Sequence, residues 1–211
     1  MADRATWQYV DELGYDMLFG SGATVNLQPR PETITGYENV AKYATVTGNA
    51  NFGKPEYLSD GMFTAQRFSQ MYEYGKTDGG LELTLKWDQP VSACAVMIYN
   101  SGNYYDAFNK VNMITFKLAE KPAWYLDDRY NGYCYIKNLS VDTSDALNEN
   151  FTLRKGNSAI AEFNTLKITE MSIYISGAPE DKFTTESESA VIEGGNKAVK
   201  ISEIYIFGNK A

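Results

Sequence analysis

The side chains available for chemistry in this chain are carboxylates, tyrosines, lysines and two cysteines, because the sequence contains no histidine. Histidine is the usual general base beside a serine or cysteine nucleophile, so its absence excludes Ser-His and Cys-His catalysis. Glycosidases use two carboxylates at a set separation, and 27 acidic residues produce chance pairs such as Asp127 and Asp128. Because adjacent acids in a polar loop usually form a solvated surface, the sequence favours a protein that is not an enzyme.

One acidic residue, Asp60, precedes Gly61 between a strand-like run and an aromatic residue in the stretch PEYLSDGMFT. An Asp-Gly pair most often forms a tight turn. The local sequence leaves three roles open for Asp60: a turn former, a catalytic acid or a metal ligand.

A second carboxylate, Glu203, lies inside the apolar stretch AVKISEIYIFG. Strict strand alternation places it on one face with four apolar residues, Val199, Ile201, Tyr205 and Phe207. A buried carboxylate without a partner is costly, so two explanations stay open. A β-bulge at Ser202–Glu203 returns Glu203 to solvent, or Glu203 stays at the rim of the sheet and binds a hard cation.

The two cysteines, Cys94 and Cys134, are too few for a disulfide framework and lack the spacing of a zinc site. Cys94 lies in the apolar run VSACAVMIY, which favours a buried free thiol. A bridge between Cys94 and Cys134 remains an open alternative.

The elements that position these residues are predicted to be β-strands. In LELTLKWDQP, four apolar residues alternate with polar ones from Leu81 to Trp87, and Asp-Gln-Pro ends this strand. The next run, 91–100, is apolar on both faces and fits a central strand that ends in a turn at Asn100–Gly102. Further strands are predicted in NMITFKLAEKP, stopped by Pro122, and in GYCYIKNLSV, NTLKITEMSIYISG and KAVKISEIYIFGN. Many short strands separated by turns indicate an antiparallel β-sandwich or jelly roll.

Helical signals are few. A short helix capped by Thr6 is predicted near the N-terminus, and a single helical turn before a strand at 44–47. Large loops are predicted between Asn100 and Asn112 and between Lys121 and Asn131, with a long polar loop or hairpin over 178–196.

Composition and charge narrow the range of partners. The chain has 211 residues with 44% hydrophobic and 22% charged residues, which fits one globular domain. A formal net charge of −8 makes nucleic acid and anionic membranes poor partners and favours a neutral ligand or a cation. No signal-peptide pattern or membrane-spanning run is present in this sequence.

Four stretches, ENVAKYATVTGN, EYLSDGMFT, LELTLKWDQPVSACAVMIYNSG and KISEIYIFGN, follow in the order and approximate spacing found in galactose-binding-like domains. The chain therefore resembles this group, which includes the discoidin (coagulation-factor type C) domains and the family 32 carbohydrate-binding modules. The resemblance assigns residues 35–211 to one all-β, antiparallel jelly-roll sandwich and residues 1–34 to an N-terminal extension or linker.

The resemblance also implies one structural calcium ion. In bacterial members it is held by the Asp of the Asp-Gly turn and by a Glu near the start of the last strand, here Asp60 and Glu203. Backbone carbonyls of the surrounding residues complete an oxygen shell of the kind that calcium favours; the corresponding positions are Tyr57, Met62, Ala65 and Ser202. Met62 stands where relatives often have Asp or Asn, so only its backbone oxygen is available.

Carbohydrate-binding relatives present aromatic faces and a few polar side chains from loops at one end of the sandwich. This arrangement suits sugars, because a sugar ring has an apolar face and a polar rim. The chain has 16 Tyr and 3 Trp, many of them in predicted loops. The aromatic candidates are Tyr72, Tyr74, Tyr104, Tyr105, Trp124, Tyr125 and Tyr130, and the hydrogen-bonding candidates are Asn103, Asp106, Asp128, Arg129 and Asn131.

We therefore expect a monomeric, non-catalytic carbohydrate-binding module of a larger extracellular or cell-surface protein. The alternative is a protein-interaction or adhesion domain of the same fold. An aromatic platform flanked by Asn, Asp or Arg favours sugar, whereas a broad flat apolar patch favours protein.

Overall fold

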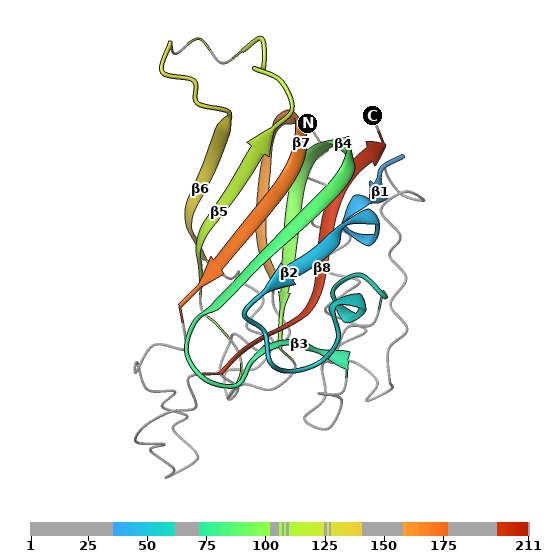
Figure 1. The fold of residues 1–211 in the computed structure, drawn as a ribbon, viewed down its shortest axis with the longest axis vertical. Coiled ribbons are helices and arrows are strands. Elements are labelled where there is room, and N and C mark those ends of the chain that lie inside the picture. The colour runs from blue at the N-terminus through green and yellow to red at the C-terminus, as the bar shows by residue number, and fades with distance from the viewer. Residues whose placement is uncertain are drawn as a thin grey trace, which may run out of the picture.

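The computed structural model of the chain describes residues 36–61, 72–101, 106, 108, 110–124, 126, 128–140, 158–176 and 198–210 (Figure 1). The elements are β1 (Glu38–Asn39), the 3-10 helix η1 (Val40–Tyr43), β2 (Thr45–Gly48), the 3-10 helix η2 (Pro55–Leu58), β3 (Tyr74–Lys76), β4 (Leu81–Asn100), β5 (Lys110–Leu118), β6 (Tyr133–Ser140), β7 (Ser158–Ile175) and β8 (Val199–Lys210). The helix predicted after Thr6, the extension 1–34 and the loop 178–196 lie outside these residues.

The strands form an antiparallel β-sandwich, which confirms the predicted fold class. The hydrogen-bonded order is β1-β8-β4-β7-β5-β6, with β2 on β4 and β3 on β8. The long strands β4 and β7 each contribute to both layers, as Figure 1 shows. We call the layer of β2, residues 81–86 of β4, residues 168–175 of β7, β5 and β6 the front layer. The back layer consists of residues 91–100 of β4, residues 158–168 of β7, and β8 with β1 and β3.

Strand β4 does not end at Asp-Gln-Pro, so that prediction is wrong. It continues to Asn100. Its pairing with β7 shifts in register between Ala93 and Ala95 and has a gap between Lys86 and Val91. Pro90 lies in this gap, where its missing N–H breaks no ladder hydrogen bond. The proline therefore marks the bend at which β4 passes from the front layer to the back layer.

The core lies between the two layers. Leu81, Leu83 and Leu85 of the alternating stretch are buried, as predicted, and pack in one cluster with Ile204 and Ile206 of β8. This burial of apolar side chains from both layers supplies the main driving force for folding.

The predicted single helical turn is confirmed as η1, and Asn39 fixes its position. The Asn39 side chain accepts hydrogen bonds from the N–H groups of Ala41 and Ile206 and donates one to the Ile204 carbonyl. This cap ties the first described residues of the chain to the middle of β8.

Cys94 is buried and Cys134 is half-buried, and neither thiol is in a disulfide bond. The prediction for Cys94 is thus confirmed, and the alternative bridge between the two is not formed. In the part of the chain that the structure describes, no helix has the length and apolar character required to cross a membrane.

Candidate functional site

A β-bulge lies on β8 at the predicted position. Tyr99 of β4 pairs with Glu203 and Asn100 pairs with Ile201, so Ser202 is the extra residue on β8. The bulge changes which residues of β8 face the core, from Val199 and Ile201 before it to Ile204 and Ile206 after it.

The bulge nevertheless does not return Glu203 to solvent, so that part of the bulge hypothesis is wrong. Glu203 is fully buried. Its Oε2 accepts a hydrogen bond from the Gly61 N–H at 3.2 Å, and its Oε1 is buried without a hydrogen-bond partner. The last strand therefore carries a buried carboxylate with one unsatisfied oxygen, which is costly in a folded protein.

The turn at Asp60–Gly61 brings the second carboxylate to this position. The helix η2 packs against β8, and its last residue, Leu58, is buried. Gly61 follows with a φ of 79°, a conformation that glycine adopts without strain. The turn interpretation is thus confirmed, and it places the Asp60 carboxyl group within hydrogen-bonding reach of Glu203.

Burial is the main reason that the pKa of Glu203 lies well above its ordinary value, and the negative charge of Asp60 raises it further. The backbone N–H groups of Gly61 and Asp60 oppose this shift without cancelling it. Two adjoining carboxyl groups with one unsatisfied buried oxygen suit either a shared proton or a hard cation.

A cation held by Asp60 and Glu203 would need further oxygen ligands, and only some of the residues predicted to supply them lie in the described ranges. Within the described ranges, no group of three or more acidic, cysteine or histidine side chains is present, so a cation here would also need backbone carbonyls. Tyr57 lies in η2 and Ser202 lies in the bulge, so both belong to the elements that form this site. Met62 and Ala65 lie outside the described residues.

The raised pKa predicts the pH dependence of stability in the presence of a chelator. Between the ordinary pKa of 4.5 and the higher folded-state value, the folded protein holds a proton at Glu203 that the unfolded chain has lost. The free energy of unfolding should therefore fall as pH rises through this interval, by up to about 1.4 kcal/mol per pH unit. Urea unfolding at several pH values measures this, and Glu203→Gln should remove that part of the slope; an equal slope in both proteins contradicts the prediction.

A buried polar cluster beside the bulge fixes the ends of the segment 101–109. The Lys200 ammonium lies 2.8 Å from the Asp106 carboxylate and 4.0 Å from the centre of the Phe52 ring. The Lys200 N–H also donates to the Asp106 carbonyl. On β4, the Asn100 amide group exchanges two hydrogen bonds with the backbone of Phe108. The predicted sugar-binding residues Asn103, Tyr104 and Tyr105 belong to this segment but lie outside the described residues.

Two residues that the sequence predicted to bind ligand are instead buried in the folded domain. Asp106 is buried in the ion pair with Lys200, and Tyr74 is buried in β3 rather than exposed in a loop. Tyr72 is half-buried, and its ring packs edge-on against Tyr57 with centroids 5.8 Å apart. The sequence assigned this stretch to a loop because it did not reveal the short strand that pairs with β8.

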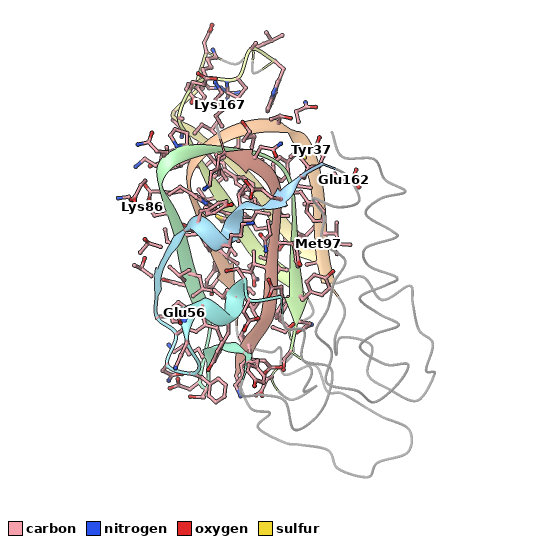
Figure 2. The ribbon with its side chains drawn as sticks, turned by 90° about the vertical axis from the view of Figure 1, so that its right-hand side faces the viewer. Tyr37, Glu56, Lys86, Met97, Glu162 and Lys167 are labelled. Atoms are coloured by element: carbon pink, nitrogen blue, oxygen red, sulfur yellow. The ribbon has the colours of Figure 1, made fainter. Side chains whose placement is uncertain are left out.

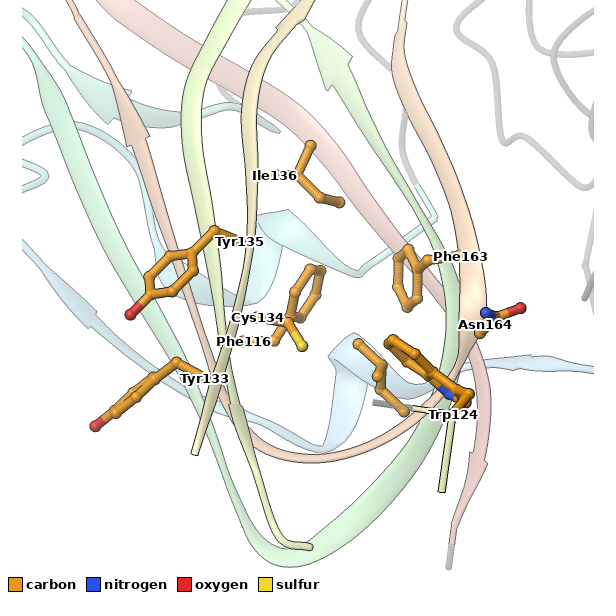
Figure 3. A pocket seen from close by; sticks show the side chains of 9 residues that line it. Phe116, Trp124, Tyr133, Cys134, Tyr135, Ile136, Phe163 and Asn164 are labelled. Carbon is orange, nitrogen blue, oxygen red and sulfur yellow. The ribbon is translucent and has the colours of Figure 1, made fainter. Parts of the chain in front are cut away.

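A pocket of about 290 Å³ opens on the side of the sandwich between β6 and the first half of β7 (Figure 3). Trp124 lies at this pocket and is 46% exposed. The rings of Phe116 and Phe163 lie 5.0 Å apart and form its apolar floor. The other lining residues are Tyr133, Cys134, Tyr135, Ile136, Asn164 and Leu166.

Trp124 is the one predicted ligand-binding residue among those that line this pocket. Nearby, Tyr130 packs against the core beneath the Lys121 ammonium, and Asn131 accepts a hydrogen bond from the Tyr133 N–H at the start of β6. Asp128 and Arg129 are exposed, and Tyr125 lies outside the described residues. The structure thus places these loop residues before β6 but does not bring them together with Tyr72.

Sequence reasoning missed Tyr133, Tyr135, Phe163 and Asn164 as pocket residues, because they belong to strands rather than to loops. The alternation in GYCYIK was the available signal, since it places Cys134 and Ile136 on the face of the strand toward the pocket and the two tyrosine rings on the opposite face (Figure 3). The proximity of this strand to Phe163 and Asn164 depends on the bend of β7, which the sequence does not reveal.

No protein-family model and no curated protein matches this chain. Among solved structures, the chain is similar to a fucolectin (F-lectin) from the serum of the striped bass Morone saxatilis, with 15% identity, a TM-score of 0.50, and coverage of 83% of this chain and 50% of that one. A fucose-binding module of Streptococcus pneumoniae has 10% identity, a TM-score of 0.48, and coverage of 82% and 99%. A family 32 module of Clostridium perfringens, solved with GlcNAc-α-1,4-galactose, has 11% identity, a TM-score of 0.45, and coverage of 88% and 99%.

The similarity to the fucolectin shows the fold of this chain, which is a galactose-binding-like β-sandwich as the sequence resemblance predicted. The chain spans about half the length of that fucolectin chain.

Proposed function

We propose that this chain is a non-catalytic glycan-binding domain with its binding site at the Trp124 pocket. The observation that supports this most strongly is the half-exposed indole of Trp124 beside the Asn164 amide, over an apolar floor. An indole face binds the C–H face of a sugar ring, while an amide group binds its hydroxyls. The fold is also that of a lectin, the striped bass fucolectin.

The proposal includes a structural calcium ion at Asp60 and Glu203. The unsatisfied buried oxygen of Glu203 and the adjoining Asp60 carboxyl support it, because a divalent cation would neutralise both carboxylates. The ion would thereby join the turn after η2 to the last strand. We further propose that the domain belongs to a larger secreted or cell-surface protein.

A protein-interaction domain is the second candidate. Leu126, which follows the pocket tryptophan by two residues, is 85% exposed, and an exposed leucine contributes more to a protein interface than to a sugar site.

A glycan-array screen followed by titration calorimetry tests the proposed function. Trp124→Ala should weaken binding of the best glycan at least about tenfold, because a central aromatic anchor typically contributes more than 1.4 kcal/mol. Tyr43→Ala is the matched control: Tyr43 is also exposed but lies in η1, where it hydrogen-bonds to Glu38. Binding of no glycan class, or equal affinity in the Trp124 variant, contradicts the proposal.

A further inference from the structure

The outer face of the back layer carries a second apolar surface, separate from the core. Ile98 of β4 and Ile204 of β8 pair with each other and belong to the core cluster. Because side chains alternate along a strand, the neighbouring pair, Met97 and Tyr205, points to the opposite face. Met97 lies on the opposite side of the molecule from Lys86 of the front layer (Figure 2). The residues of this outer face are Ala95, Met97 and Tyr99 of β4 and Glu203, Tyr205 and Phe207 of β8.

The apolar side chains of this outer face are buried, although they do not belong to the core cluster. Each of them is 5% exposed or less. The ring of Tyr205 packs against Tyr99 and Phe207, with centroids 6.4 and 6.0 Å apart. A contiguous patch of this kind is rarely left in water by a soluble domain. Further residues must therefore cover the outer face.

The described elements do not supply this cover at the centre of the face. The helices η1 and η2 both contact β8, but their buried side chains belong to the core cluster on the other side of the sheet. The turn at Gly61 reaches the outer face at Glu203, at one end. No element in the described ranges lies over the pair of Met97 and Tyr205. The covering residues therefore belong to a part of the chain outside those ranges.

The N-terminal segment, residues 1–35, reaches the sandwich at the other end of this face. Tyr37 directly precedes β1, and its hydroxyl group lies within hydrogen-bonding reach of the Cys94 thiol. The same thiol donates to the Phe207 carbonyl at 3.6 Å. The segment therefore joins the described chain beside Phe207, where a short connection can lead it back across the outer face.

The other segments outside the described ranges fit this position less well. Segment 62–71 starts at the Glu203 end, after Gly61, and returns to that end at Tyr72, close to the pairing of Tyr74 with Ile201. Segments 141–157 and 177–197 are rich in charged and hydroxyl side chains. An apolar surface needs an apolar partner, so these two compositions argue against them.

The sequence of the N-terminal segment supplies such a partner. Its apolar residues Trp7, Val10, Leu13 and Met17 recur every three or four positions, and Asp11, Glu12 and Asp16 lie between them. This spacing is typical of an amphipathic helix. Eleven residues of helix are about 16 Å long and about 10 Å wide. From Glu203 to Phe207 the outer face is about 14 Å long, and it is about 10 Å wide across β7, β4 and β8, so one helix can cover it.

We infer that residues 1–35 dock on the outer face of the back layer, with the amphipathic stretch 7–17 over Met97 and Tyr205. This inference goes beyond the proposed function and does not depend on it. It makes the N-terminal segment a third layer of the folded domain rather than a linker to a neighbouring one.

Acrylamide quenching of the Trp7 fluorescence tests the inference. In a Trp124→Phe background the remaining tryptophans are Trp7 and Trp87, and Trp87 is buried, so quenching reports on Trp7. Trp7 should be quenched several-fold less than free N-acetyltryptophanamide. Leu13→Asp should raise the quenching several-fold, because it places an unpaired charge on the docked face. Glu12→Lys is the matched control on the polar face and should leave the quenching unchanged.

Removal of residues 1–35 provides a second measurement. The truncated chain should melt below the full chain and should bind the dye ANS, as exposed apolar surface does. A synthetic peptide of residues 1–35 should restore its melting temperature, and the same peptide with Leu13→Asp should not. If the truncated chain does not fold, the quenching of Trp7 in the full chain decides.

Three results overturn the inference. The first is quenching of Trp7 in the folded chain as strong as that of the free indole compound, and the second is equal quenching in the Leu13→Asp and Glu12→Lys variants. The third is a concentration-dependent dimer of the full chain in which Trp7 is accessible, since a second copy then covers the outer face.

Discussion

Removal of calcium with a chelator is expected to lower the melting temperature of this protein by about 5–15 °C. An ion that binds only the folded state stabilises it by about 2.7–4.1 kcal/mol at 100–1,000 times its dissociation constant. For a domain of this size, each kcal/mol corresponds to about 2–4 °C. The physical cause is the pair of carboxyl groups at Asp60 and Glu203, one of them fully buried with an unsatisfied oxygen. Differential scanning calorimetry with calcium or with EDTA measures the shift.

Three variants make this experiment specific. Glu203→Gln should abolish the calcium response and, in EDTA at neutral pH, should melt above the wild-type protein, because a glutamine of the same shape is neutral without the proton uptake that a buried Glu203 requires. Asp60→Asn should also abolish the response. Glu82→Gln changes an exposed glutamate of β4 and should leave the response intact. An identical melt of the wild-type protein with calcium and with EDTA, together with no bound calcium by elemental analysis, rules out the proposed ion.

Lys200→Met is expected to destabilise the fold by about 3–5 kcal/mol, because it leaves the buried Asp106 carboxylate without its ammonium partner. The corresponding drop in melting temperature is about 6–20 °C. The methionine retains most of the apolar stem, so the loss measures the missing charge rather than a cavity. Urea unfolding followed by tryptophan fluorescence gives the free energy.

The chain contains a matched control for this variant. Lys167 and Glu120 form an ion pair of similar length, 2.9 Å, but both side chains are largely exposed. Lys167→Met should therefore cost less than about 1 kcal/mol. The double variant Lys200→Met/Asp106→Leu should recover much of the lost stability, because it removes both buried charges. A loss below 1 kcal/mol in Lys200→Met itself refutes the assigned role of the ion pair.

The local pattern of apolar and polar residues was sufficient to predict most of the strands. Alternation around Leu83 predicted a half-buried strand because the side-chain period of a strand is two, and burial of one face follows from that period alone. The same rule failed at Pro90, where the sequence indicated an end and the structure has a bend. A proline lacks a backbone N–H wherever it stands, but this costs a ladder hydrogen bond only where a neighbouring strand would pair with it, so the neighbouring strand determines whether a strand ends there or bends.

The sequence-based prediction of functional residues also agreed with the structure at some positions and failed at others. Trp124 was a candidate from its loop sequence, and the structure places it at a pocket. Asp106 was a candidate by the same reasoning, yet it forms a buried ion pair with a lysine 94 residues later. Loop composition predicts exposure on average, but the partner of a polar side chain is set by which distant strand packs against it.

By itself, the sequence determined the all-β character and the exclusion of histidine-dependent catalysis, because both follow from residue type and short-range periodicity. It offered the bulge at Ser202 and the turn at Gly61 only as alternatives among others. Only the tertiary structure decided that Glu203 is buried beside Asp60, and that Asp106 pairs with Lys200. The contacts between Gly61 and Glu203 and between Asp106 and Lys200 join residues 142 and 94 positions apart in the chain, and no local propensity encodes such packing.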